Sequence, residues 1–151
     1  MEYERLIDEF CRIKGLRGVV PDADGVVVFT AGEIRVTVRT ALQPDTVLLV
    51  ANLAECPAEG AAKLDRLLMG VNFAYAIGSG MSLSFDPTQN RYCLVCRFPI
   101  RQTEPADFTK GFDLFIRQAV EWRQAIQSFR PYLGEAPRQE DLPLSDGLLR
   151  V

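Results

Sequence analysis

The residue types that could do chemistry are few in this chain, and their spacing argues against a catalytic or metal centre. Its 151 residues include no histidine, which is the commonest general base near neutral pH and the commonest metal ligand. Cys93 and Cys96 have the Cys-x-x-Cys spacing of zinc and redox sites. They fall within an expected strand, however, where residues an odd number apart point to opposite faces and cannot share one tetrahedral ion. We therefore expect ordinary half-buried cysteines at both positions.

The acidic turn motifs also favour a structural role. The segment Pro21–Gly25 resembles the start of a calcium loop, but Val26 and Val28 occupy the next ligand positions. Carboxylate pairs such as Asp22 and Asp24 lie in turn sequence, where nothing encloses them to shift a pKa. We predict no catalytic residue, no metal site and no cofactor, and hence a protein that is not an enzyme.

Composition restricts the protein to a few classes. Apolar residues make up 48% of the chain, charged residues 25%, and the net charge is −3, so a full core is available and a disordered chain is excluded. The isoelectric point near 5.0 argues against nucleic acid and against anionic membrane surfaces as partners. No apolar run approaches the ~20 residues of a membrane span. The charged start of the chain is unlike a secretory signal, so we expect a cytosolic protein with reduced thiols.

Hydrophobic periodicity predicts eight elements. Amphipathic helices are expected over residues 2–14, 58–76 and 103–129, the last with Thr103 as its cap. Strands are expected over 26–30, 33–39, 45–52, 81–86 and 91–98. The third is apolar on both faces, so it is either central or covered on its outer face by another part of the structure. The order α-β-β-β-α-β-β-α predicts an α+β fold, in which an antiparallel twisted sheet packs against helices.

We expect residues 1–130 to form a single domain and residues 131–151 to form a flexible tail. Three helices can cover a five-stranded sheet only in part, so some apolar surface must face solvent or another chain. Such surplus apolar surface indicates partner binding.

Two segments allow more than one interpretation. The first helix is short and apolar over a wide arc, which fits either a core helix or the wall of a groove for an extended peptide. In the second helix, Asn72 lies among apolar neighbours and either caps a backbone group or pairs across an interface. Gly70 in the same helix costs about 1 kcal/mol and allows another backbone to approach closely.

These features together resemble the class I type III secretion chaperones, the group that includes the Tir chaperone. The resemblance covers roughly residues 2–129 and depends on the order of four motifs more than on any one of them. The motifs are the first helix at Leu6–Phe10, the helix segment Leu67–Phe73, the hairpin from Ser82–Pro87 to Tyr92–Leu94, and the last helix through Ala119–Trp122.

The resemblance implies a homodimeric chaperone of the bacterial cytoplasm without enzymatic activity. Such a chaperone binds the N-terminal segment of a type III secreted effector in extended form and keeps it competent for secretion. The residues that would contact this partner are Leu6, Ile7, Phe10, Ile13, Val28, Phe29, Val36, Val38 and Leu49. The residues that would form the dimer interface are Leu67, Leu68, Val71, Asn72, Leu83 and Phe85.

The alternative is a small-ligand-binding or regulatory domain of the same architecture, because a fold does not fix a function. A deep, enclosed apolar pocket with a few convergent polar groups would favour it.

Overall fold

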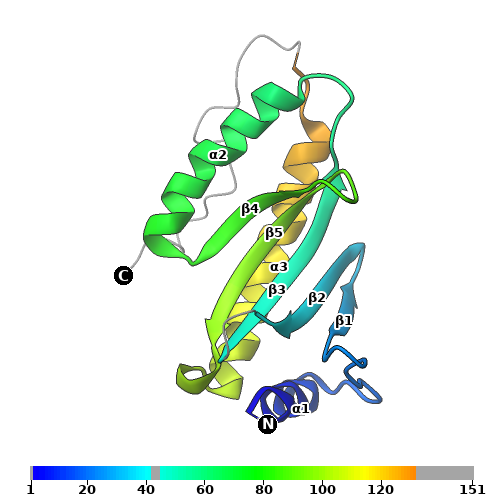
Figure 1. The fold of residues 1–151 in the computed structure, drawn as a ribbon, viewed down its shortest axis with the longest axis vertical. Coiled ribbons are helices and arrows are strands. Elements are labelled where there is room, and N and C mark those ends of the chain that lie inside the picture. Colours follow the sequence, from blue (N-terminus) through cyan, green and yellow to red (C-terminus); the bar gives the residue numbers. More distant parts are fainter. Residues whose placement is uncertain (1, 42–44, 132–151) are drawn as a thin grey trace.

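The computed structural model describes residues 2–41 and 45–131, and in that part of the chain the elements follow the predicted order (Figure 1). The predicted tail lies outside the described residues, apart from Pro131. The elements are α1 (Glu2–Lys14), β1 (Val27–Ala31), β2 (Ile34–Thr40), β3 (Thr46–Glu55), α2 (Ala61–Gly78), β4 (Met81–Asp86), β5 (Arg91–Pro99), the 3-10 helix η1 (Ile100–Gln102) and α3 (Pro105–Ser128).

The strands form one five-stranded antiparallel sheet in the order β1-β2-β3-β5-β4. The prediction of an α+β fold is therefore confirmed, and β3 is central, which is one of the two alternatives that its sequence left open. Leu49 on β3 pairs with Val38 on β2 and with Cys96 on β5. This register places alternate apolar side chains of neighbouring strands on one face of the sheet.

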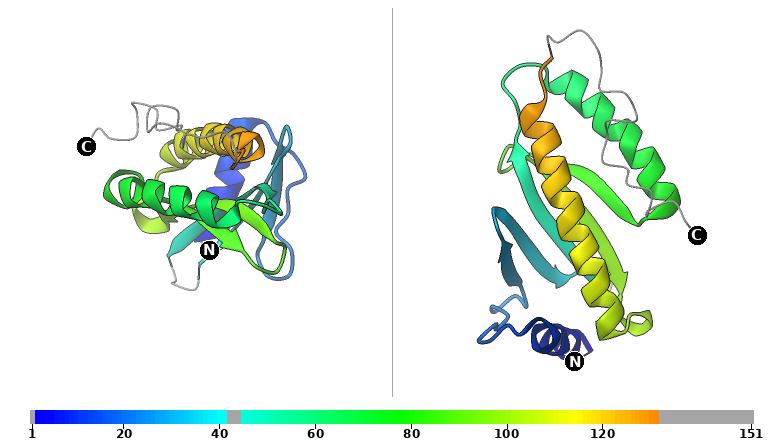
Figure 2. Two further views of the ribbon diagram at one scale, coloured as in Figure 1. Left: turned by 90° about the horizontal axis from the view of Figure 1, so that it is seen from above. Right: turned by 180° about the vertical axis from the view of Figure 1, so that it is seen from behind.

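The helices cover this sheet unequally. α3 lies across one face and packs against β3, β2 and β5, while α2 lies beside β4 (Figure 2). On the opposite face of β3, Leu48 and Val50 are only half-buried. β3 is central in the sheet, but none of the described helices covers its second face.

An aromatic cluster anchors α1 to the rest of the fold. The ring of Phe10 lies 5.4 Å from that of Phe29 on β1, and 5.3 Å and 4.8 Å from those of Phe108 and Phe112 on α3. Phe10 retains 1% of its exposure and Phe108 none. The pairs with Phe29 and Phe108 are edge-to-face and the pair with Phe112 is tilted, and aromatic pairs of these kinds add about 0.5–1.5 kcal/mol each to the burial of the rings. A short terminal helix is thereby fixed by one side chain that contacts both layers.

A buried polar network joins α2 to α3. The indole N–H of Trp122 donates to the hydroxyl oxygen of Tyr75 at 2.6 Å, and the Tyr75 hydroxyl donates to Oε1 of Gln118 at 3.0 Å. Burial raises the pKa of the Tyr75 phenol, an effect that the Trp122 hydrogen bond partly offsets. All three side chains are at most 1% exposed, so the Trp122 N–H and the Tyr75 hydroxyl find their hydrogen-bond partners inside the network.

The start of α3 differs from the prediction. Thr103 does not cap the helix, because the N-cap residue is Glu104 and no side chain caps there. The Thr103 hydroxyl instead donates to the carbonyl oxygen of Pro99 at 2.7 Å. Thr103 therefore closes the η1 turn, and Pro105 occupies the first turn of α3, where the missing N–H costs nothing.

The two cysteines of β5 lie on opposite faces of the sheet, as their odd spacing predicts. Cys96 pairs with Leu49 on the core face, and burial raises the pKa of its thiol to about 11. Cys93 pairs with Asn52 on the other face, with its Sγ 3.7 Å from Asn52 Oδ1. Both are free thiols.

We predict that Tyr75→Phe lowers the free energy of unfolding by about 1–3 kcal/mol. The substitution keeps the ring but leaves the buried Trp122 N–H without its acceptor and removes one hydrogen bond from Gln118, and a buried polar group without a partner carries its full desolvation penalty. Urea unfolding followed by circular dichroism measures the loss.

The control is a double-mutant cycle with Gln118→Leu. If the network is coupled, the cost of Tyr75→Phe changes when Gln118 is already leucine. Strictly additive losses would contradict the network.

Candidate partner-binding surfaces

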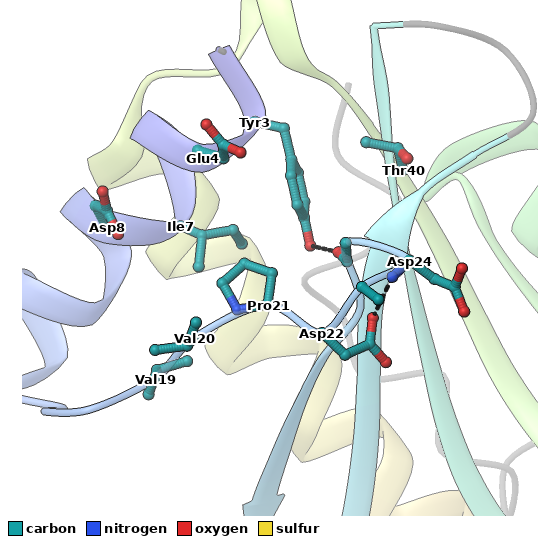
Figure 3. Close-up of a pocket in the computed structure, with 12 residues that line it drawn as sticks. Tyr3, Glu4, Ile7, Asp8, Val19, Val20, Pro21, Asp22, Asp24 and Thr40 are labelled. Atoms are coloured by element: carbon teal, nitrogen blue, oxygen red, sulfur yellow. Dashed lines mark hydrogen bonds between the residues drawn. The ribbon is translucent and has the colours of Figure 1, made fainter.

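A groove of about 660 Å³ lies between α1 and the loop that leads to β1 (Figure 3). Ile7 forms part of its apolar lining, together with the loop residues Val19, Val20 and Pro21. Val20 is 78% exposed, so this apolar side chain has little cover from its own chain. The full lining is Tyr3, Glu4, Ile7, Asp8, Val19, Val20, Pro21, Asp22, Ala23, Asp24, Gly25 and Thr40.

Hydrogen bonds fix the loop against α1. The Tyr3 hydroxyl lies 2.9 Å from the carbonyl oxygen of Gly25 and 3.2 Å from that of Val38, and so connects α1 to the loop and to β2. The Asp22 carboxylate accepts hydrogen bonds from the N–H groups of Asp24 and Val26, both at 2.9 Å. This Asx turn shapes the loop locally. These hydrogen bonds hold the groove in shape without a bound partner.

The groove is acidic. Glu4 and Asp8 contribute carboxylates from α1, and Asp22 and Asp24 contribute them from the loop. Burial raises the pKa of Tyr3 to about 12, with a further contribution from the nearby Asp22 carboxylate, and Arg39 opposes the shift. Among the described residues that line the groove there is no lysine or arginine.

The two edges of the sheet differ. β1 pairs only with β2, so its other edge presents backbone N–H and C=O groups that no strand of the described chain takes up. Such an edge can accept an additional strand from a partner. β1 also follows directly after the groove loop, so the groove and the open edge adjoin.

A side chain of α2 covers the β4 edge at its middle, at Leu83. The Asn72 amide nitrogen donates to the carbonyl oxygen of Leu83 at 2.7 Å, and Asn72 Oδ1 accepts from the Leu83 N–H at 2.7 Å. These are the two hydrogen bonds that a residue of a neighbouring strand would make. Of the two interpretations that the sequence left open, the structure shows that Asn72 caps a backbone within its own chain.

A second apolar surface, the α2 stripe, consists of Met69, Phe73 and Ile77. These side chains recur every four residues and are 73%, 74% and 67% exposed. A Cβ built on Gly70 would meet nothing within 4 Å, so its surroundings are also open. Phe85 on the adjoining β4 is 46% exposed. α2 and α1 lie at opposite ends of the molecule in Figure 1.

The structure separates the residues that were predicted to contact a partner. Ile13 and Val28 are each 45% exposed, and Ile7 lines the groove although it is only 1% exposed. The others are core residues of this chain and could act only by shaping the surface from beneath. They are Leu6, Phe10, Phe29, Val36, Val38 and Leu49.

The residues predicted for the dimer interface are divided in the same way. Leu68, Val71 and Leu83 are buried inside the chain, Leu67 and Asn72 are half-buried, and Phe85 is 46% exposed. The buried members face the core from α2 and β4. The exposed apolar side chains of α2 are instead those of the α2 stripe, Met69, Phe73 and Ile77.

Sequence reasoning missed the α2 stripe and the loop residues Val19 and Val20. α2 carries apolar residues on two sides, and a helix that is apolar all round is either fully buried or packed against another chain. That pattern could have revealed Phe73 and its neighbours. No comparable signal marks Val19 and Val20, since a short apolar pair before a turn is common.

Two other kinds of site are absent from the described ranges. No group of three or more cysteine, aspartate or glutamate residues within 2–41 and 45–131 is arranged to hold a metal ion. Over the same residues, no helix combines the length and the hydropathy that crossing a membrane requires.

The sequence model of the Tir chaperone protein (CesT) family matches residues 5–123. No curated protein matches the sequence. Solved structures with a similar fold include a chain of the HopA1–SchA chaperone–effector complex. It shares 16% identity over 82% of this chain and 94% of its own, with a TM-score of 0.71.

Two more complexes contain chains of similar fold. A chain of the ExsC–ExsE complex has 20% identity over 81% of this chain and 91% of its own, with a TM-score of 0.70. A chain of the complex between the Yersinia pestis type III secretion chaperone SycH and a stable fragment of YscM2 has 14% identity over 78% and 96%, with a TM-score of 0.63. At such identities the likeness shows the fold.

We predict that Tyr3 makes the stability of the protein fall in alkaline solution. Its folded-state pKa of about 12 exceeds the ordinary phenol value of 10.0, so the folded state holds the phenol proton more tightly than the unfolded state. The stabilisation is fully present below about pH 10 and is lost as the pH rises towards 12. Urea unfolding across this range should show a smaller decline for Tyr3→Phe than for the wild type. Parallel curves would contradict the assignment.

We also predict that Asn72→Leu lowers the free energy of unfolding by about 1–3 kcal/mol, because it leaves both backbone groups of Leu83 without a partner. An opened β4 edge should also promote edge-to-edge association, which light scattering at rising concentration measures. The matched control is Gln124→Leu, a change of the same kind at an exposed position of α3. Similar behaviour of the two variants would show that Asn72 does not protect the edge.

Proposed function

The chain belongs to the Tir chaperone protein (CesT) family, and on that basis we propose that it binds the N-terminal segment of a type III secreted effector. The segment is held in extended form, which keeps it competent for secretion. A second copy of the chain covers the α2 stripe, so the working unit is a homodimer.

The observation that carries this proposal is the separation of two uncovered surfaces. The α2 stripe lies at one end of the molecule, and the groove with the open β1 edge lies at the other (Figure 1). One surface can therefore be covered by a second copy while the other stays accessible. In a protein with a single uncovered surface, the second copy and the effector segment would compete for the same site.

Strand addition explains how an unfolded segment is held. Its backbone pairs with the free edge of β1, and its apolar side chains enter the groove at Val20 and reach Val28 on the adjoining strand. Each well-buried apolar anchor contributes about 1.5–3 kcal/mol, whereas ordering the segment costs about 2–5 kcal/mol or more. Several anchors are therefore required, which suits a groove continued by a strand edge.

The dimer interface is proposed to centre on Phe73, with Met69 and Ile77 on either side. Gly70 next to them leaves room for close approach of the partner helix. The predicted residues Leu68 and Val71 support this face from inside the chain, and Phe85 extends it onto β4. Aromatic and methionine side chains are enriched in such interface centres.

The similar structures support this function because they come from complexes of secretion chaperones with partner proteins. SchA is described in a chaperone–effector complex with HopA1, and SycH as a type III secretion chaperone bound to a fragment of YscM2. Family membership also supports a protein without enzymatic activity that acts in the bacterial cytoplasm, with neither nucleic acid nor membrane as partner. A small-ligand domain would instead call for an enclosed apolar pocket, whereas this groove carries four carboxylates.

We predict that Phe73→Glu converts the dimer to a monomer. Light scattering during gel filtration should change from twice 16.9 kDa to 16.9 kDa. The monomer should stay folded, because Phe73 is 74% exposed and contributes little to the core. Val120→Glu on α3, where valine is 38% exposed, is the matched control and should remain dimeric. A Phe73→Glu protein of unchanged mass would place the interface elsewhere.

We further predict that the double variant Val20→Asn and Val28→Asn loses the effector segment but remains a dimer. The test is co-expression with the N-terminal segments of secreted proteins encoded beside this chain, followed by measurement of the mass of the purified complex. Both side chains are exposed, so the change removes apolar anchors without opening the core. Wild-type affinity of this variant would refute the groove assignment, and a wild-type chain that binds none of the segments would refute the chaperone function.

A further inference from the structure

We propose that the groove between α1 and residues 19–25 selects a stretch of the partner in which lysine or arginine alternates with apolar residues. This inference rests on the proposed function, since it takes the occupant to be the extended segment of a secreted protein. It adds the chemistry of that occupant, which the family assignment does not give.

The groove combines an apolar floor with acidic walls. Ile7 and Val19 form the floor together with Val20. Glu4 and Asp8 lie four residues apart on α1 and therefore on one face of that helix. Figure 3 shows Asp22 and Asp24 on the loop across the groove from them. A segment seated in the groove thus meets carboxylates on both sides.

The chain does not neutralise these carboxylates with the basic residues at the end of α1. Arg12 donates two hydrogen bonds to Glu9, at 3.0 Å and 2.6 Å, on the same helix. Lys14 pairs with Asp113 on α3. Arg39, whose charge acts on Tyr3 at the groove wall, and Arg17, which lies with Asp8 and Val19 around the neighbouring hollow, stand against the carboxylates of Asp8, Asp22 and Asp24. The local charge is therefore negative, and a basic occupant complements it.

The geometry also explains why apolar and basic residues should alternate. Successive side chains of an extended segment point to opposite sides, so one set can face the apolar floor while the other reaches the walls. Lysine and arginine can lay their methylene stems along Val20 and still bring the charged head to Asp8 or Asp24. An acidic segment would face like charges on both walls, which discriminates against it.

The experiment uses the full-length chain and three blocked synthetic peptides of equal length. In these peptides valine alternates with lysine, with glutamine or with glutamate. Binding is measured by nuclear magnetic resonance titration, which also locates the peptide through the amide signals of Ile7, Val19 and Val20. We expect the lysine peptide to bind about tenfold more tightly than the glutamine peptide, since two exposed ion pairs supply a difference of that size. The glutamate peptide should bind most weakly, and added salt should reduce the differences.

The test variant is Asp8→Asn with Asp24→Asn, which neutralises one carboxylate on each wall and leaves the Asx turn of Asp22 intact. It should bring the lysine peptide close to the affinity of the glutamine peptide. The matched control is Glu55→Gln with Asp107→Asn, which changes the net charge equally at exposed ion pairs outside the groove. The control should bind as the wild type does.

Equal affinity for the lysine and glutamine peptides, an unaltered preference in the test variant, or no binding of any peptide would overturn the inference. None of these results would contradict the proposed chaperone function, which is tested separately by the complex with the secreted protein. If that complex forms while the peptides show no preference, the groove is occupied without charge selection. If the preference is found but no secreted segment binds, the groove chemistry stands and the chaperone function fails.

Discussion

The amide of Asn72 forms with Leu83 the two hydrogen bonds that a further strand would otherwise form at the edge of β4. Because the side chain belongs to α2, the helix and the sheet edge are held together by polar contacts with defined geometry, in addition to apolar packing. Within the described chain the β1 edge has no such cover. An extended partner that pairs with backbone groups therefore meets less obstruction at β1, next to the groove, than at β4.

The position of α2 has a second effect. Since α2 uses Leu64, Leu68, Val71 and Tyr75 to reach the core, its opposite side is turned outward, and Phe73 is exposed there. A helix that lay flat on the sheet could hide most of its apolar residues in one layer. A helix beside the last strand cannot, so the chain carries an apolar surface that requires a second molecule. Edge protection and the interface surface therefore have one structural origin.

The sequence was sufficient for the element order, the antiparallel sheet and the opposite faces of Cys93 and Cys96, because each follows from local periodicity. It was insufficient for deciding which apolar face of an element is buried. Phe10 and Val38 looked as available for a partner as Val28 does, and only the packing of α3 determines that the first two are core. The same limit applies to α2, where Val71 and Phe73 are both apolar but face opposite ways. Val20 escaped attention because the loop is brought to α1 by the contact between Tyr3 and Gly25, far apart in sequence.

The chain contains a single tryptophan, and Trp122 lies in the contact between α2 and α3, 1% exposed and bonded to Tyr75. The fluorescence of its indole therefore reports whether α2 is packed against α3. Loosening of that helix would admit water to the ring and move its emission to longer wavelength. Occupation of the groove at α1, at the far end of the molecule, would leave the emission wavelength unchanged. One emission spectrum therefore distinguishes a displaced α2 from an occupied groove.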